Sequence, residues 1–357
     1  MKGGASSPTS PSGCAVKPQL AGQPARTYRK QKAGGESAPM RSIEFCAGAG
    51  GQALGLEQAG FRHAALVEIE PEFAKTLSVN RPDWSVYAQD MAAFDGRPYQ
   101  GVELMAAGLP CPPFSIAGKQ LGEADERNLF PEALRLIDEI RPRAVMIENV
   151  RGFLSAVFDD YRALLKEQLT KLGYHAEWRL LNASDFGVPQ LRPRVVIVAV
   201  RHELSDLFDW PEVRPHNPPT VGETLRDLMA ANGWPGADAW AKRASEIAPT
   251  IVGGSKKHGG PDLGPTRARR AWASLGVEGR SIAEEAPGPD FVGMPRLTVR
   301  MVARLHGFPD HWRFNGRKTT AYRQVGNAFP PPVAKAVANN LRIALSVRRL
   351  FAVGASG

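Results

Sequence analysis

Residues 42–68, SIEFCAGAGGQALGLEQAGFRHAALVE, contain the pattern that decides the fold. A short apolar run over 42–46 predicts a strand, the glycines after it predict a tight turn, and 51–60 has the composition of a helix. A second apolar run over 64–67 then ends at Glu68. Strand, glycine turn, helix and strand in this order are typical of a parallel sheet that binds a ligand at the carboxyl ends of its strands.

The same alternation continues along the first half of the chain. Apolar runs at 104–107, 144–147 and 195–200 predict further strands, with residues at helical spacing between them. The predicted fold class is therefore α/β, with a doubly wound, mostly parallel sheet. Residues 201–291 lose the alternation, and a helical repeat of apolar residues returns at 333–345. This change favours a second, smaller domain placed before a C-terminal helix.

The composition excludes several classes of protein. The 357 residues include three cysteines, and no two of them form a C-x-x-C pair, so neither a disulfide framework nor a metal site is predicted. No apolar run approaches the roughly 20 residues that span a bilayer, and no signal-peptide pattern opens the chain. We therefore expect a cytoplasmic protein without a membrane partner.

The net charge of +9 is concentrated at the two ends of the chain. Residues 1–40 carry six basic and one acidic side chain, and residues 292–357 carry eleven basic and one acidic. A basic surplus is compatible with a polyanionic partner but does not identify one. The location of the surplus makes the C-terminal part of the chain the candidate for contact with phosphate groups.

The glycine cluster and Glu68 are candidate ligand-binding residues. Gly48, Gly50 and Gly51 let a ligand approach the backbone closely, although a tight turn also needs glycine. Glu68 follows at the end of the second predicted strand, where a carboxylate can accept hydrogen bonds from ribose hydroxyls. The cluster lacks the lysine of a phosphate-binding loop, so a kinase or ATPase is not expected.

Four further side chains lie where the later predicted strands begin or end. Cys111, in the rigid sequence PCPP, is either a reactive thiol or a small buried apolar residue. Glu148 is either a proton donor with a raised pKa or a helix N-terminal carboxylate. Arg192 and Arg194 are suited to holding a carboxylate, a phosphate or a carbonyl oxygen, and ordinary surface arginines are the alternative.

Taken in order, six motifs resemble those of the DNA (cytosine-5)-methyltransferase family, most of all its bacterial restriction–modification members. The resemblance runs from about Arg41 to Val347. The motifs are the glycine cluster with QALGLEQAGF at 52–61, Pro110-Cys111 with Phe114-Ser115, Glu148-Asn149-Val150, Gln190 with Arg192 and Arg194, Arg296-Leu297-Thr298 with Gly307-Phe308-Pro309, and Gln324-Val325-Gly326-Asn327-Ala328. The family usually has Phe at the position of Cys46 and Gln at that of Pro112, which leaves the contacts at these two positions open.

The resemblance implies an S-adenosylmethionine-dependent methyltransferase fold and transfer of the methyl group to carbon 5 of a cytosine flipped out of duplex DNA. Cys111 would attack carbon 6 as a thiolate, and Glu148 would bind ring nitrogen 3 and the exocyclic amine. Arg194, supported by Arg192, would hold the ring carbonyl. The cofactor product would be S-adenosylhomocysteine. We expect a monomer that protects DNA from a restriction endonuclease, its functional partner.

The resemblance also assigns the binding residues. The implied cofactor-binding residues are Gly48, Gly50, Gly51, Glu68, Ile69, Asp90, Pro110 and Asn327. Among them, Ile69 would lie against the adenine, Asp90, at the end of a weak strand, would bind the adenine amine, and Asn327 would close the methionine end. The implied DNA-binding residues are Ser115, Lys119, Gln120, Lys256, Lys257, Arg267, Arg269 and Arg270. Each of the basic residues at 253–270 either reads a base edge or contacts phosphate only.

Four segments are expected. They are a disordered basic tail at 1–40, a catalytic cofactor-binding domain at 41–205, a target-recognition domain at 206–320, and a C-terminal helix at 321–357 that returns to the catalytic domain. The tail has almost no aliphatic residues to bury, and Met40, just before the first predicted strand, is a candidate translation start.

Three other functions are alternatives. A methyltransferase of the same chemistry could act on tRNA, although the insert at 201–291 and the late arginines favour duplex DNA. A DNA-binding protein could use the same fold without catalysis, although the set of Cys111, Glu148 and Arg194 opposes this. A nicotinamide dehydrogenase is suggested by the glycine loop alone.

Overall fold

The computed structural model describes residues 39–110, 128–213, 217–253 and 260–353, with side chains to residue 346. Pro39–Gly357 forms one compact unit. Several predicted residues lie outside the described residues: the tail as far as residue 38, Cys111, Ser115, Lys119, Gln120, Lys256 and Lys257.

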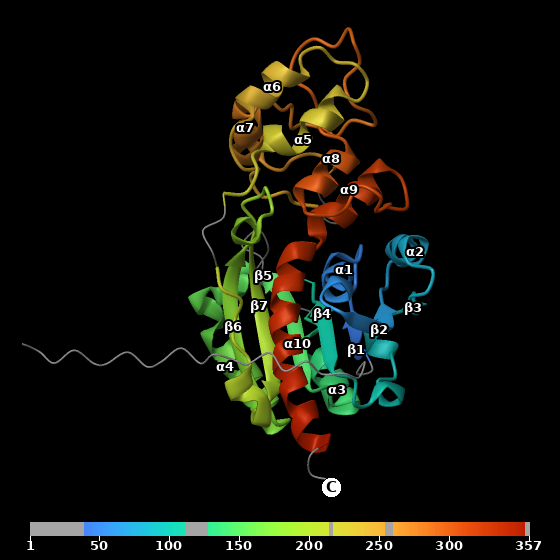
Figure 1. The fold of residues 1–357 in the computed structure, drawn as a ribbon, viewed down its shortest axis with the longest axis vertical. Coiled ribbons are helices and arrows are strands. Elements are labelled where there is room, and N and C mark those ends of the chain that lie inside the picture. Colours follow the sequence, from blue (N-terminus) through green and yellow to red (C-terminus); the bar gives the residue numbers. More distant parts are fainter. Residues whose placement is uncertain (1–38, 111–127, 214–216, 254–259, 354–357) are drawn as a thin grey trace, which may run out of the picture. The chain divides into compact units, whose positions relative to one another are not determined.

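A seven-stranded sheet is the centre of this unit (Figure 1). Its strands are β1 (Met40–Phe45), β2 (Phe61–Val67), β3 (Val86–Tyr87), β4 (Leu104–Gly108), β5 (Ala144–Val150), β6 (Tyr174–Asn182) and β7 (Pro193–Arg201). The spatial order is β3-β2-β1-β4-β5-β7-β6, and β1 to β5 pair in parallel. Only β7 runs in the opposite direction, antiparallel to both β5 and β6. The predicted doubly wound, mostly parallel sheet is confirmed.

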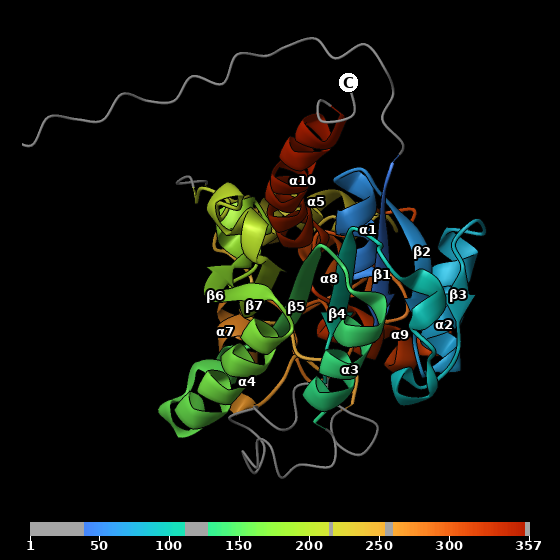
Figure 2. The same ribbon diagram turned by 90° about the horizontal axis from the view of Figure 1, so that it is seen from below.

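Helices cover both faces of the sheet because the buried strands are apolar on both sides. The flanking helices are α1 (Gly51–Gln58), α2 (Pro71–Asn80), α3 (Phe130–Ile140), α4 (Asp159–Lys171) and α10 (Pro331–Val353). In β4, Met105 and Ala107 pack in one core cluster with α3 and α4, whereas Leu104 and Ala106 pack in another with α10. Figure 2 shows α3 and α4 on one face and α10 on the other.

The middle of the chain contains short helices. They are α5 (Val221–Ala230), α6 (Ala237–Arg243), α7 (Thr266–Ser274), α8 (Val299–Leu305) and α9 (Lys318–Asn327). Thr220 begins α5 with a capping box, in which its hydroxyl accepts from the backbone of Glu223 while the Glu223 carboxylate accepts from the backbone of Thr220. Buried Trp240 and Trp272 belong to a core cluster that also contains Leu54 of α1. A separate target-recognition domain at 206–320 stays a prediction.

Membrane-spanning helices and metal-ligand clusters are both absent from the described part of the chain. No helix there is both long and apolar enough to cross a membrane. No group of three or more His, Cys, Asp or Glu side chains there is placed to hold a metal ion.

Candidate active site

A cavity of about 470 Å³ lies at the carboxyl ends of β1, β2, β4 and β5. This is where ligands bind in doubly wound sheets, because the strand order reverses there and leaves a crevice between neighbouring loops. The predicted residues that line it are Gly48, Gly51, Glu68, Ile69, Asp90, Pro110, Glu148 and Asn327. Gly50, Arg192 and Arg194 do not line it.

The glycine loop is held by Glu68 from the end of β2. The backbone N–H groups of Gly48 and Glu70 donate to the two carboxylate oxygens of Glu68, at 2.7 and 2.8 Å. Burial raises the pKa of Glu68, although these backbone donors oppose the rise. One carboxylate therefore fixes the turn at Gly48, where φ is +57° and a Cβ would meet open space.

The other two glycines of the loop have a packing role. A Cβ on Gly50 would lie 2.7 Å from Leu77 and 2.9 Å from Trp312, and a Cβ on Gly51 would lie 2.1 Å from the carbonyl oxygen of Phe329. The role of Gly50 in cofactor binding stays a prediction, because Gly50 does not line the cavity. Gly50 brings the glycine loop against side chains of α2 and of the C-terminal part of the chain.

Ile69 and Asp90 lie on the wall beside β2 and β3. Ile69 is 58% exposed and lines the cavity, so its side chain is accessible to a bound ligand. Asp90 was expected at the end of a weak strand, but β3 ends at Tyr87. Asp90 instead begins a 3-10 turn at Met91–Ala93, and its Oδ1 accepts from the N–H of Ala92 at 2.9 Å.

Glu148 and Arg194 form a buried ion pair beside the cavity. The antiparallel register of β5 and β7 aligns Val150 with Arg194, and the Arg194 Nε lies 2.8 Å from Glu148 Oε1. Burial raises the pKa of Glu148, and the positive charges of Arg194 and Arg192 limit the rise. The carboxyl group that lines the cavity can therefore hold a proton or a hydrogen-bonded partner more readily than an exposed carboxylate.

Arg192, which was expected to support the same site, is fully buried and binds backbone carbonyls. Its Nη1 donates to Ile251 at 2.6 Å, and its Nη2 donates to Gly326 at 2.8 Å and Ala328 at 2.9 Å. It thereby joins the start of β7 to two distant segments of the chain. The positive charge of Arg192 still lowers the pKa of Glu148, but its three hydrogen bonds are to backbone carbonyls around the cavity.

Gln190 and His306 complete this buried network. Gln190 Oε1 accepts from the N–H of Ile251 at 3.0 Å, and its amide nitrogen donates to His306 Nδ1 at 3.1 Å. The other ring nitrogen of His306 lies 3.0 Å from the carbonyl of Ala328 and therefore carries the proton. Burial lowers the pKa of His306 well below its ordinary value, so the ring is neutral.

Glu44 and Gln52 are cavity residues that the sequence analysis did not identify. Both are buried and line the cavity. Glu44 Oε2 and both polar atoms of the Gln52 amide have no hydrogen-bond partner among the described residues. Burial, with the nearby charge of Glu68, raises the pKa of Glu44 well above its ordinary value. The signal in the sequence was a carboxylate within the otherwise apolar run at 42–46.

The predicted DNA-binding arginines of the described residues lie on α7. Arg267 and Arg270 are exposed and Arg269 is half-buried, with its Nη2 3.3 Å from Thr266 Oγ1. None of the three lines the cavity. Their role in reading DNA stays a prediction.

The fold and the cavity define a doubly wound α/β protein with a buried acid–arginine pair, and comparison with known proteins specifies its family. The model of the family described as C-5 cytosine-specific DNA methylase matches residues 40–342. The chain belongs to this family and is an enzyme of the DNA (cytosine-5-)-methyltransferase class, as the motifs predicted.

Two relatives and one solved structure illustrate the similarity. The type II methyltransferase M.NaeI of Lentzea aerocolonigenes is 56% identical over 314 residues, which cover 86% of this chain and 76% of the relative. The type II methyltransferase M.NgoMIV of Neisseria gonorrhoeae is 54% identical over 85% of this chain and 97% of its own length. A crystal structure of a DNMT2 mutant from Spodoptera frugiperda covers 85% of this chain and 99% of its own, with a TM-score of 0.59 and 19% identity, and supports the fold.

Proposed function

We propose that this enzyme transfers a methyl group from S-adenosylmethionine to carbon 5 of a cytosine flipped out of a specific duplex DNA site. The observation that carries the proposal is the buried Glu148–Arg194 pair in and beside the wall of the cavity. A carboxyl group with a raised pKa can hydrogen-bond ring nitrogen 3 and the exocyclic amine of cytosine, and an arginine can hold the ring carbonyl.

The described cavity residues fit the proposed cofactor. Glu68 would accept hydrogen bonds from the ribose hydroxyls, the exposed Ile69 would lie against the adenine, and Asp90 would accept from the adenine amine. Glu44, with an unpartnered buried oxygen in the cavity, offers a polar contact for the methionine end. Gly48, Gly50, Gly51, Pro110 and Asn327 complete the proposed binding set. When bound, the cofactor supplies an electrophilic methyl group on a sulfonium.

The proposed nucleophile, Cys111, lies outside the described residues, and its neighbour Pro110 lines the cavity. The thiolate would form a bond to carbon 6, and Glu148 would stabilise the electron density that reaches the ring. Carbon 5 would then take the methyl group, leaving S-adenosylhomocysteine, and would lose its proton to solvent as the bond from sulfur to carbon 6 breaks. The ring is then aromatic again and the thiolate is restored. A stacked duplex hides carbon 6, so the base must first be flipped out.

Duplex DNA is the proposed substrate and a restriction endonuclease the proposed functional partner. Both named relatives are type II methyltransferases, which supports a protective role in a bacterial cytoplasm. We propose that the enzyme acts as a monomer. Ser115, Lys119, Gln120, Lys256, Lys257, Arg267, Arg269 and Arg270 are the proposed DNA contacts, in a target-recognition region within 206–320.

Methyl transfer in vitro tests the proposal. The purified protein is incubated with tritiated S-adenosylmethionine and either duplex DNA or tRNA, and bisulfite sequencing then locates the methylated cytosines. We expect label in duplex DNA, at carbon 5 of one recurring sequence. Cys111→Ser should abolish the label, with Cys14→Ser as the matched control. Label in tRNA alone, or full activity of Cys111→Ser, would contradict the proposal.

A further inference from the structure

The segment at 90–99 forms the cavity wall beside Asp90, and it has little regular structure. Asp90 and Met91 line the cavity, and the segment contains only two 3-10 turns, Met91–Ala93 and Arg97–Tyr99. No strand ladder of the sheet includes these residues. Because such a segment lacks the hydrogen bonds of a helix or strand, its position depends on side chains from elsewhere.

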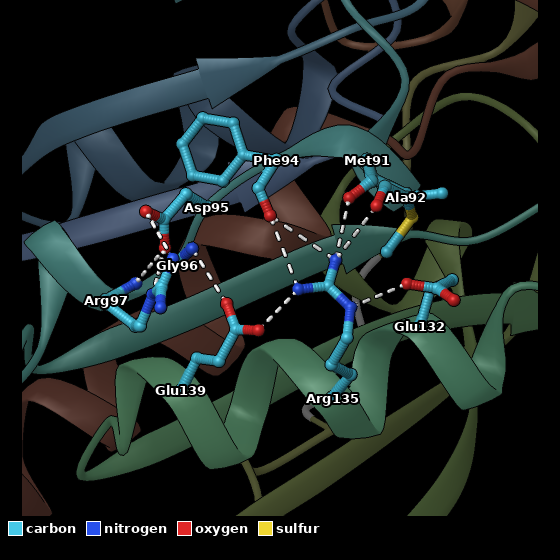
Figure 3. A network of polar contacts seen from close by, with 9 residues as sticks. All are labelled: Met91, Ala92, Phe94, Asp95, Gly96, Arg97, Glu132, Arg135 and Glu139. Atoms are coloured by element: carbon cyan, nitrogen blue, oxygen red, sulfur yellow. Dashed lines mark hydrogen bonds and ion pairs between the residues drawn. The ribbon is translucent and has the colours of Figure 1, made fainter.

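Arg135 of α3 supplies those hydrogen bonds (Figure 3). Its Nη2 lies 3.2 Å from the carbonyl oxygen of Met91, 3.3 Å from that of Ala92 and 3.3 Å from that of Phe94. Its Nη1 also lies 3.3 Å from the oxygen of Phe94. One guanidinium therefore binds three carbonyls within four consecutive residues.

Two acidic residues of the same helix hold the guanidinium in place. Glu132 and Glu139 accept from Arg135 at 2.8 and 2.6 Å, one turn before it and one turn after it. Glu139 also accepts from the N–H of Gly96 at 2.9 Å. Gly96 lies so close to α3 that a Cβ there would be 2.8 Å from Ile140 Cγ1. The segment is thus bound to α3 at both its beginning and its middle.

Ala92 links this network to the cavity. Its N–H donates to the Asp90 carboxylate at 2.9 Å, and the carbonyl of the same peptide unit, that of Met91, accepts from Arg135 at 3.2 Å. The Phe94 ring packs edge-on against Phe45 of β1, with 5.3 Å between ring centroids. A shift of the Met91–Ala92 peptide would therefore turn the Asp90 carboxylate, while the Phe94 ring anchors the middle of the segment.

We propose that Arg135 is a positioning residue for the adenine end of the cofactor, acting through Asp90. The inference rests on the proposed function of the cavity. Arg135 does not line the cavity, so it acts on the cavity wall through the carbonyls that it binds. It orients the Asp90 carboxylate toward the adenine amine before the cofactor arrives, so that binding does not have to order the segment.

A double-mutant cycle tests the proposal. Binding of S-adenosylhomocysteine to the full chain is measured by calorimetry for the wild type, Asp90→Ala, Arg135→Ala and the double variant. We expect each single variant to weaken binding about tenfold, as the loss of one good polar contact does. Because Arg135 acts through Asp90, the double variant should be weaker by no more than about twentyfold rather than a hundredfold.

A second ligand distinguishes positioning from a general loss of structure. S-Inosylhomocysteine has an oxygen in place of the adenine amine, and the wild type should prefer the adenine compound. Arg135→Ala should lose most of this preference, and Arg135→Lys should restore only part of it, because a lysine cannot form the fork that binds several carbonyls. The matched control is Arg97→Ala, which removes an exposed ion pair with Asp95 in the same segment and should keep both affinities.

The outcomes separate this inference from the proposed function. Wild-type protein that binds neither ligand and methylates no DNA would contradict the proposed function itself. Wild-type binding, together with unchanged affinity in both Arg135 variants or fully multiplicative effects in the double variant, would overturn the inference alone. If Arg135→Ala does not fold, Arg135→Lys in the wild-type and Asp90→Ala backgrounds carries the same cycle.

Discussion

Arg192 and Arg135 each bind three backbone carbonyls around the same cavity, but their surroundings differ. Arg192 is fully buried and joins segments that are far apart in the sequence. The Arg135 side chain is 34% exposed and joins a helix to a nearby segment, with two carboxylates beside it. Water can replace the contacts of Arg135 when it is removed, but it cannot easily reach those of Arg192. The contacts of Arg192 should therefore contribute mainly to the stability of the fold, and those of Arg135 mainly to the position of the segment that it binds.

The largest expected effect is that of Arg192→Met on stability. The substitution leaves the buried carbonyls of Ile251, Gly326 and Ala328 without this donor, and it should lower the free energy of unfolding by about 4 kcal/mol. Arg135→Met should cost about 1 kcal/mol or less. Urea unfolding of the two variants measures the difference. Equal costs would show that burial does not explain the contrast.

Glu44 tests whether burial also controls stability at a side chain whose Oε2 has no hydrogen-bond partner among the described residues. Its raised pKa means that ionisation above the ordinary value of 4.5 favours the unfolded chain. Wild-type stability is therefore fully present below that value and declines as pH rises toward the folded pKa, whereas Glu44→Gln does not titrate. Relative to the wild type, the variant should gain about 1.4 kcal/mol per pH unit as pH rises above the ordinary value, until the raised pKa of the folded state is reached.

Thermal or urea unfolding at several pH values measures this gain. The control is Val157→Ala at a 64% exposed side chain without a titrating group, whose difference from the wild type should stay constant with pH. A constant difference for Glu44→Gln as well would mean that Glu44 has a partner in solution.

Gly326→Ala tests the packing of the segment whose Gly326 carbonyl accepts from Arg192. In an ordinary helix this change stabilises by about 1 kcal/mol. Here the new Cβ would lie 2.4 Å from the backbone N and Cα atoms of Gly253, so we expect a loss of about 2 kcal/mol and weaker S-adenosylhomocysteine binding. Gly288→Ala, where a Cβ meets nothing within 4 Å, is the matched control. Stabilisation by Gly326→Ala would show that the two segments separate easily.

The smallest expected effect is that of Arg141→Gly at the end of α3. Arg141 has a φ of +49° and ψ of 52°, a left-handed conformation that glycine adopts without strain. The exposed ion pair with Asp138, at 3.6 Å, contributes little. The variant should gain about 0.5 kcal/mol and keep its affinity for S-adenosylhomocysteine. A change in affinity would mean that Arg135 depends on the stability of its helix as a whole.

Much of the fold and part of the cavity could be predicted from the sequence. The carboxyl ends of parallel strands meet at one edge, so Glu68, Glu148 and the glycine loop had to lie near one another. The reversal of β7 could not be predicted, because an apolar run has the same composition in either direction. Strand β6 was missed because Glu177 and Arg179 interrupt its apolar residues, and only three of its nine residues are buried.

The side chains that support the cavity were harder to predict. Glu44 and Gln52 are buried, which is opposite to the usual exposure of these residue types. Arg135 has the appearance of a helix-surface arginine between two glutamates, and nothing local indicates that it binds the carbonyls of another segment. The resemblance placed Arg192 at the same site as Arg194. Arg192 precedes β7, however, so the alternation of side chains along a strand does not govern it, and its guanidinium binds the carbonyls of Ile251, Gly326 and Ala328.

The glycine loop depends on the part of the chain that is synthesised last. Trp312 donates from its indole nitrogen to the carbonyl of Ala49 at 3.1 Å, and Gly51 packs against the carbonyl of Phe329. A nascent chain that has left the ribosome only as far as β7 has all seven strands but lacks these covering residues. The ability to bind the cofactor should therefore arise only near the end of translation, because a ribosome-bound fragment that stops before residue 312 lacks both these contacts and α10, which covers one face of the sheet.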